Sequence, residues 1–129
     1  MNFQILASAS HTPPAEGDTS AVALPNDADA LALPLDGVTR IDLHFPAFTD
    51  GRAFSQAYLL RRRRGFSGEI RATGDVLIDQ LVQMQRTGFS SAVLKEGVDA
   101  ADAQRQFARF QGFYQADAVQ AKPIFVLEP

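Results

Sequence analysis

The sequence predicts an α/β fold of repeated βα units, with a sheet of four or five mostly parallel strands. Segments with strand-like and helix-like spacing of apolar residues alternate along the chain. Two joints, Gly65-Phe66-Ser67 and Gly88-Phe89-Ser90, each follow a helical pattern and precede a strand pattern, 23 positions apart (88 − 65). Glycine after a helix adopts a left-handed conformation without strain, and the next apolar residue packs back on the last turn. Successive units of this kind pair in parallel with right-handed crossovers.

The chain of 129 residues fits one domain. Residues 10–20 are rich in proline, glycine and small polar residues, which is typical of a loop. We therefore expect residues 1–20 to form a partly flexible N-terminal segment and residues 21–129 to form a single α/β domain.

The expected elements follow in order. Residues 21–24 are apolar and form a short strand, and Pro25-Asn26-Asp27 supplies a turn and a cap for a short helix that ends near Leu35, because Pro34 breaks it. Strands are expected at residues 41–45, 69–73 and 91–95, and helices at residues 53–64, 76–87 and 100–114. The last helix spaces Phe107, Phe110 and Tyr114 for burial. Residues 124–127 form either an edge strand or an ordered tail.

The strands alternate between apolar and polar residues. Ile41, Leu43 and Phe45 face one way, whereas Asp42 and His44 face the other, and the next two strands follow the same pattern. A parallel sheet covered on both faces is normally apolar throughout. The alternation therefore indicates helices mainly on one side, as in a partial barrel, with the polar face as a ligand surface or a contact with a second subunit. The alternative is an open three-layer sheet with a few paired buried charges.

Composition excludes several classes of site. The chain has no cysteine and only two histidines, which removes disulfides, thiol nucleophiles and iron–sulfur ligation, and we predict no metal site and no cofactor. No apolar run has the length of a membrane span, and the N-terminus lacks the basic start of a secretion signal, so a cytoplasmic location without a membrane partner is expected. Overall acidity argues against nucleic acid.

The positive charge is concentrated in the middle of the chain. Residues 40–71 hold seven arginines and three acidic residues, or +4, so the remainder carries −7 of the net −3. Local positive charge on an acidic protein favours a small oxyanion or an acidic partner, and the planar guanidinium of arginine suits oxyanions.

Candidate site residues lie where the predicted strands end, because parallel α/β sheets bind ligands at the carboxyl ends of their strands. The first loop contains Thr49, Asp50, Gly51 and Arg52, directly before a helix whose free N–H groups could hold an anion clamped by Arg52. The alternative is that Asp50 caps the helix and Arg52 faces solvent.

The next strand adds Arg71 and the pair Gly74-Asp75. Asp75 is a candidate acid or base, or else a helix cap, and His44 is a candidate acid or base, or else a structural histidine. Arg71 lies between apolar neighbours and needs a partner, which could be Asp42, Glu69, a ligand oxyanion or another subunit.

Over residues 21–115 the sequence resembles the DUF934 family, an uncharacterised bacterial family labelled as a probable oxidoreductase or accessory protein of sulfite reduction. The resemblance rests on these residues: Phe45-Pro46-Ala47-Phe48-Thr49-Asp50-Gly51-Arg52, Ser55-Gln56-Ala57, Leu59-Leu60-Arg61, Gly65-Phe66, Gly68-Glu69, Arg71-Ala72, Gly74-Asp75-Val76-Leu77, Asp79-Gln80, Gly88-Phe89 and Tyr114-Gln115.

The chain departs from that family pattern at four positions. The family usually has lysine at Ala47, an aliphatic residue at Thr73, arginine at Ile78 and cysteine near Thr87. A second cation beside the Thr-Asp-Gly-Arg loop is therefore missing, and a thiol at that last position is not essential here.

The resemblance implies a role beside sulfite reductase in assimilatory sulfur metabolism. Reducing sulfite requires redox cofactors, and this chain offers no cysteine ligands. Three functions follow as hypotheses. The first is an accessory or small-anion-binding protein with an oxyanion site formed by the loop residues above. The second is a small enzyme acting on an anionic substrate through His44 or Asp75. The third is a module that docks a second copy, as a homodimer, or a sulfite reductase subunit.

Overall fold

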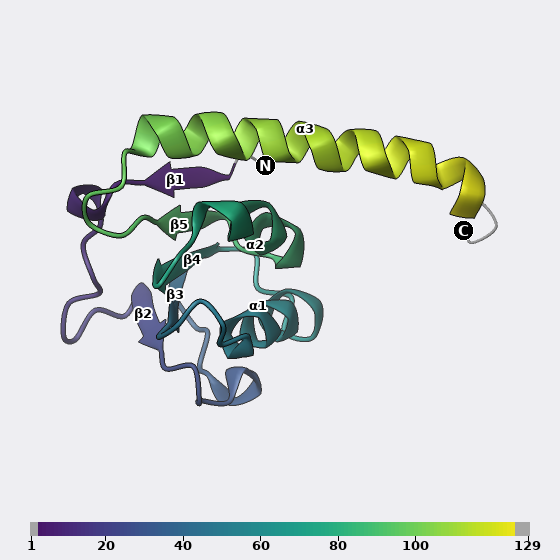
Figure 1. Cartoon of the computed structure of the whole chain (residues 1–129). Helices are drawn as coiled ribbons and strands as arrows, with labels where there is room; N and C mark the ends of the chain where they lie inside the picture. Colours follow the sequence, from purple (N-terminus) through teal and green to yellow (C-terminus); the bar gives the residue numbers. More distant parts are fainter. Residues whose placement is uncertain (1–2, 126–129) are drawn as a thin grey trace.

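A computed structural model of the chain describes residues 3–125, with side chains described for residues 3–112. Five parallel strands form one open sheet in the order β1-β5-β4-β3-β2 (Figure 1). The strands are β1 (Gln4–Leu6), β2 (Ala21–Leu24), β3 (Arg40–Phe45), β4 (Glu69–Gly74) and β5 (Ser91–Val93). The helices are α1 (Arg52–Arg62), α2 (Leu81–Thr87) and α3 (Ala100–Phe125), with single 3₁₀ turns at η1 (Ser8–Ser10), η2 (Ala30–Ala32) and η3 (Ile78–Gln80). The predicted α/β class and parallel pairing are confirmed.

The alternation along β3 decides which face of the sheet the helices cover. Ile41, Leu43 and Phe45 are fully buried in the core with α1, and the Phe45 ring packs edge-on against Phe54. Helices α1 and α2 cover this face, and α3 packs along β1 and α2 (Figure 1). The opposite face is crossed by the connection from β1 to β2. The sheet is therefore open and one-sided, and β1 and β2 are its two edges.

Both glycine joints form as predicted. Gly65 and Gly88 have positive φ angles of 63° and 132°. The N–H of Phe66 donates to the Leu60 carbonyl at the end of α1, and the N–H of Phe89 donates to the Met84 carbonyl at the end of α2. Each phenylalanine side chain is buried, so each joint ends a helix and anchors the start of the next strand.

Several element boundaries differ from the sequence-based expectation. The sheet gains β1 from the segment that precedes residue 21, because Gln4–Leu6 pairs with β5 and Phe3 stacks on Phe107 of α3. The predicted helix over residues 76–87 starts later, since Val76 is buried in an extended connection and only η3 and α2 are helical. The short helix before Leu35 is reduced to η2.

The predicted last helix is longer than expected and continues to Phe125, so residues 124 and 125 belong to α3 and not to a strand. Residues 115–122 contain no glycine or proline and favour helical continuation. The rest of the predicted 124–127 strand and the Tyr114 side chain lie outside the described parts of the chain. In Figure 1, α3 extends well past α2 at its C-terminal end.

Candidate functional site

The two groups of candidate residues that follow strands, residues 49–52 after β3 (the first corner) and Gly74-Asp75 at the end of β4 (the second corner), lie side by side at the carboxyl edge of the sheet. Phe45 at the end of β3 pairs with Gly74 at the end of β4. The N–H of Asp75 donates to the Phe45 carbonyl at 2.7 Å, and the Asp75 carboxylate accepts from the N–H of Phe48 at 2.8 Å. The loop after β3 is therefore held directly against the residue that follows β4.

In the first corner, the carboxylate of Asp50 neutralises Arg52. Asp50 accepts from the Arg52 backbone N–H at 3.0 Å and from its guanidinium at 2.8 and 3.1 Å. Asn26 donates to the same carboxylate. The hydrogen bonds from the Arg52 guanidinium and N–H lower the pKa of Asp50 to about 2. The Arg52 side chain remains 60% exposed, with Thr49 and Gly51 exposed beside it, and Gly51 rather than Asp50 is the N-cap of α1.

In the second corner, Asp75 pairs with Lys95, which follows β5. The Lys95 ammonium lies 2.8 Å from the Asp75 carboxylate. This ion pair, together with the N–H of Phe48, lowers the pKa of Asp75. The alternative reading of Asp75 as a helix cap is wrong, because the chain after it is extended and its carboxylate ties two loops together. Lys95 was not predicted as a site residue.

The corners are therefore adjacent, but each cation already has a carboxylate partner. Charged pairs at an exposed edge contribute little stability, and both partners stay available to a charged surface that approaches them. A free oxyanion at this edge would have to displace Asp50 from Arg52 or Asp75 from Lys95. The arrangement suits a docking contact better than a dedicated oxyanion pocket.

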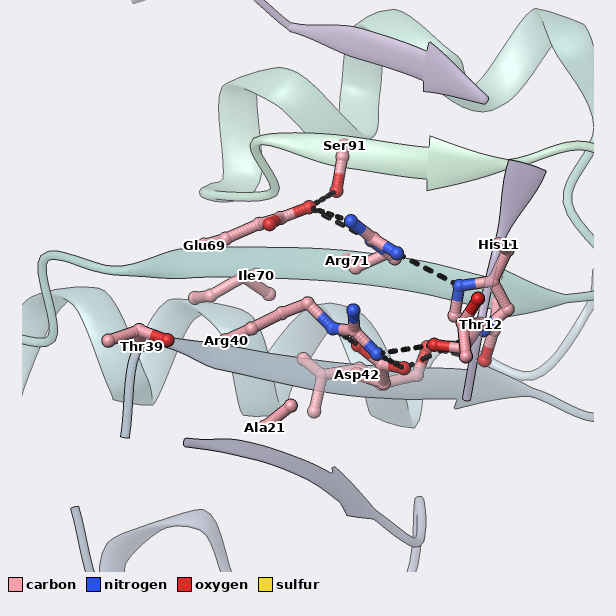
Figure 2. A network of polar contacts seen from close by, with 12 residues as sticks. His11, Thr12, Ala21, Thr39, Arg40, Asp42, Glu69, Ile70, Arg71 and Ser91 are labelled. Atoms are coloured by element: carbon pink, nitrogen blue, oxygen red, sulfur yellow. Dashed lines mark hydrogen bonds and ion pairs between the residues drawn. The ribbon is translucent and has the colours of Figure 1, made fainter. Parts of the chain in front are cut away.

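Arg71 belongs to a separate network on the polar face of the sheet, shown in Figure 2. Its guanidinium lies 2.8 Å from the Glu69 carboxylate, which also accepts from the Ser91 hydroxyl at 2.6 Å. A third contact joins the Arg71 guanidinium to Nδ1 of His11 at 3.0 Å. Of the partners considered for Arg71, the structure shows Glu69, and the Arg71 side chain is only 12% exposed.

A second charge pair lies beside the first on β3. Arg40 donates to Asp42 at 2.8 Å and to the carbonyl of Thr12 at 2.9 Å. Asp42 is nearly fully buried, and His11 Nε2 lies 3.7 Å from its carboxylate. His11 and Thr12 thus hold the connection from β1 to β2 across the polar face of β3 and β4 (Figure 2).

The environment of His11 favours its neutral form. Because a guanidinium N–H can only donate, Nδ1 of His11 accepts from Arg71, and the proton of the neutral ring is then on Nε2, towards Asp42. Burial lowers the pKa of His11 below 6.5, and the charges of Arg71 and Arg40 lower it further, while Asp42 and Glu69 act in the opposite direction.

His44 lies on the same face, closer to the carboxyl edge. It is exposed, and its Nδ1 lies 3.3 Å from the Thr73 hydroxyl. Arg71 lies two residues before Thr73 on β4, and its guanidinium already contacts Glu69 and His11. Within the described residues, His44 and Arg71 make no contact with each other, so the structure does not assemble them into one catalytic pair.

The sequence did not indicate that His11 and Lys95 belong to these sites, or that the Asp42 carboxylate pairs with Arg40. Asp42 was visible in the strand alternation, but its partner was not. His11 gave no signal, because it lies in a breaker-rich stretch far from β4 in sequence. Among the residues whose side chains are described, no cluster of three or more histidine, aspartate or glutamate side chains is arranged to hold a metal ion.

The fold and these surfaces define a class of protein: a small α/β protein with an open, all-parallel sheet and helices on one face. The family model named DUF934, a bacterial protein of unknown function, matches residues 21–125, and the chain belongs to this family. Neither the curated proteins nor the solved structures include a significant match. No helix in the described part of the chain combines the length and apolar character needed to cross a bilayer.

Proposed function

We propose that this protein is an accessory protein of assimilatory sulfite reduction that acts by docking a partner and is not itself the redox catalyst. The sulfite-reduction context comes from the family resemblance. The docking role rests on one observation, which is that a parallel sheet keeps one of its two faces free of helices.

Parallel sheets are normally covered on both faces, because the crossover helices distribute over them. Here α1 and α2 cover one face, and only the connection containing His11 and Thr12 is tied to the other by the contacts above. Gln4, Ala23 and His44 remain exposed along that polar face, which is the open face of the sheet. A second protein that lies on β2 and β3 would complete the usual three layers.

The ion pairs of this face are shielded by the connection from β1 to β2, since the Asp42 and Arg71 side chains are only 5% and 12% exposed. A partner would therefore contact the exposed residues Gln4, Ala23 and His44 rather than the paired charges. The absence of cysteine from the whole chain leaves cysteine-ligated redox centres to the partner.

The test measures binding of the full chain to purified sulfite reductase by surface plasmon resonance. Ala23 pairs with Asp42 and is exposed on the open face, so Ala23→Arg should weaken binding at least tenfold by placing a bulky charge in the contact. Tyr58→Arg introduces the same charge at an exposed position of α1 and should leave binding unchanged. Equal binding by wild type and Ala23→Arg would reject the open face as the docking surface, and no binding by wild type would reject the reductase as the partner.

A further inference from the structure

A pocket of about 200 Å³ lies at the edge of the sheet opposite the predicted corners. Its lining consists of Phe3, Arg61, Gln85, Gly88, Phe89 and Ser90. Phe3 directly precedes β1 and Ser90 directly precedes β5, so the pocket is at the amino ends of these strands. None of the residues predicted as a site from sequence contributes to it.

Arg61 in the lining is only partly satisfied by the protein. Its Nε donates to the Gly88 carbonyl at 2.8 Å, and its Nη1 donates to the carbonyls of Phe66 and Gly68 at 2.7 Å each. A guanidinium has five N–H donors, and these bonds use three. The two on Nη2 remain, and this nitrogen is buried without a hydrogen-bond partner.

The positive charge of Arg61 also lacks a counter-ion. Of the four consecutive arginines at the end of α1, none forms an ion pair with a carboxylate in the described part of the chain. The carbonyls that Arg61 contacts carry only partial charges, and burial lowers the pKa of its guanidinium. A desolvated cation with free donors is costly unless an acceptor reaches it.

The rest of the lining indicates what kind of acceptor fits. Gln85 uses its amide oxygen to accept from Gln111 at 3.1 Å, which leaves its NH₂ group as a second donor from α2. Phe3 and Phe89 supply aromatic walls. An apolar cavity of about 150 Å³ already accommodates benzene, so this pocket has room for a ring-sized apolar body with a polar end.

We propose that this pocket binds a small organic carboxylate with an apolar or aromatic body, held by Nη2 of Arg61 and the amide of Gln85. The carboxylate supplies the acceptor and counter-ion that Arg61 lacks, and the apolar body packs between Phe3 and Phe89. Because Nη2 is shielded from solvent, binding requires a small movement of a lining side chain, and Gln85 is the longest flexible one beside Arg61. This site is independent of docking on the open face, which lies on the other side of the sheet from the helices.

The test titrates benzoate into the full chain and follows binding by NMR and calorimetry. Benzamide is the neutral isostere, and acetate is the carboxylate without a ring. The variants are Arg61→Lys, which retains the charge but removes Nη2, and Gln85→Met, which retains the volume but removes the amide. Their matched controls are Arg62→Lys on the same helix and Gln83→Met at an exposed position of α2.

Benzoate should bind saturably in the millimolar range or tighter, with the largest resonance shifts at Phe3 and Phe89. Benzamide and acetate should each bind at least tenfold more weakly, Arg61→Lys should lower benzoate affinity at least tenfold, and Gln85→Met should lower it about threefold. Both controls should bind as wild type does. The proposal is overturned if benzoate shows no saturable binding, if benzamide binds as well as benzoate, or if the shifts map outside the pocket. Should Arg61→Lys fail to fold, unchanged affinity in Gln85→Met overturns it equally.

Discussion

Gly74 ends β4 where the two corners meet, and its replacement by alanine tests whether the backbone there is as constrained as the structure indicates. Its backbone φ angle is +92°, a conformation that residues with a Cβ atom rarely adopt. A Cβ atom at this position would lie 2.6 Å from Cε1 of His44 and even closer to the backbone oxygen of Phe45. The histidine is exposed and can turn away, but the Phe45 carbonyl is fixed in β3 and accepts from the Asp75 N–H.

The size of the effect follows from these two contributions. The positive φ angle costs about 1–2 kcal/mol for a residue with a Cβ. Displacing a strand carbonyl in a packed sheet adds about 1–3 kcal/mol. Gly74→Ala should therefore lower the free energy of unfolding by about 2–5 kcal/mol, which is a large part of the total stability of a typical domain.

Urea unfolding followed by circular dichroism measures this loss as a lower midpoint at an unchanged slope. Two further glycines separate the contributions. Gly37 has a φ angle of +76° with open space around a Cβ, so Gly37→Ala should cost only about 1–2 kcal/mol. Gly51 has an ordinary φ angle of −90° and open space, so Gly51→Ala should stay within about 1 kcal/mol of wild type. If Gly74→Ala costs no more than Gly37→Ala, the close approach of β3 and β4 at this corner is refuted.

The remaining predictions concern the polar face. Arg71→Met should lower the free energy of unfolding by about 2–3 kcal/mol, because it leaves the half-buried Glu69 carboxylate without its cation. The control Arg105→Met removes an exposed ion pair and should change this free energy by less than about 1 kcal/mol. Equal losses for the two variants in urea unfolding would contradict the network. For His11, the folded-state pKa lies below the unfolded value of 6.5, so its stabilising effect is complete above pH 6.5 and is lost as the pH falls through the folded pKa. His11→Gln should therefore show a smaller loss of stability below pH 6.5 than wild type in urea unfolding, and identical pH profiles for the two proteins would count against the His11 contacts.

How much of the site could be predicted varies with the distance in sequence between its parts. The corner at Asp50 and Arg52 is local, so both residues were identified, although their mutual pairing makes them poor oxyanion ligands. The contact of Arg71 with His11 joins residues 60 positions apart, and no local pattern indicates it. The unsatisfied Nη2 of Arg61 was equally hidden, because a run of arginines at a helix end is typical of a solvated surface.

The amino-acid sequence by itself determined the α/β class, the parallel pairing, the two glycine joints and the polar character of one sheet face. These properties follow from the periodicity of apolar residues and from backbone freedom at glycine, which act over a few neighbouring positions. Only the tertiary structure decided that the chain start adds β1 to the sheet, that Lys95 completes the Asp75 corner, and that Arg61 faces a pocket. Each of these depends on packing between distant segments, and packing is set by the shape and polarity of the whole core rather than by any local run of residues.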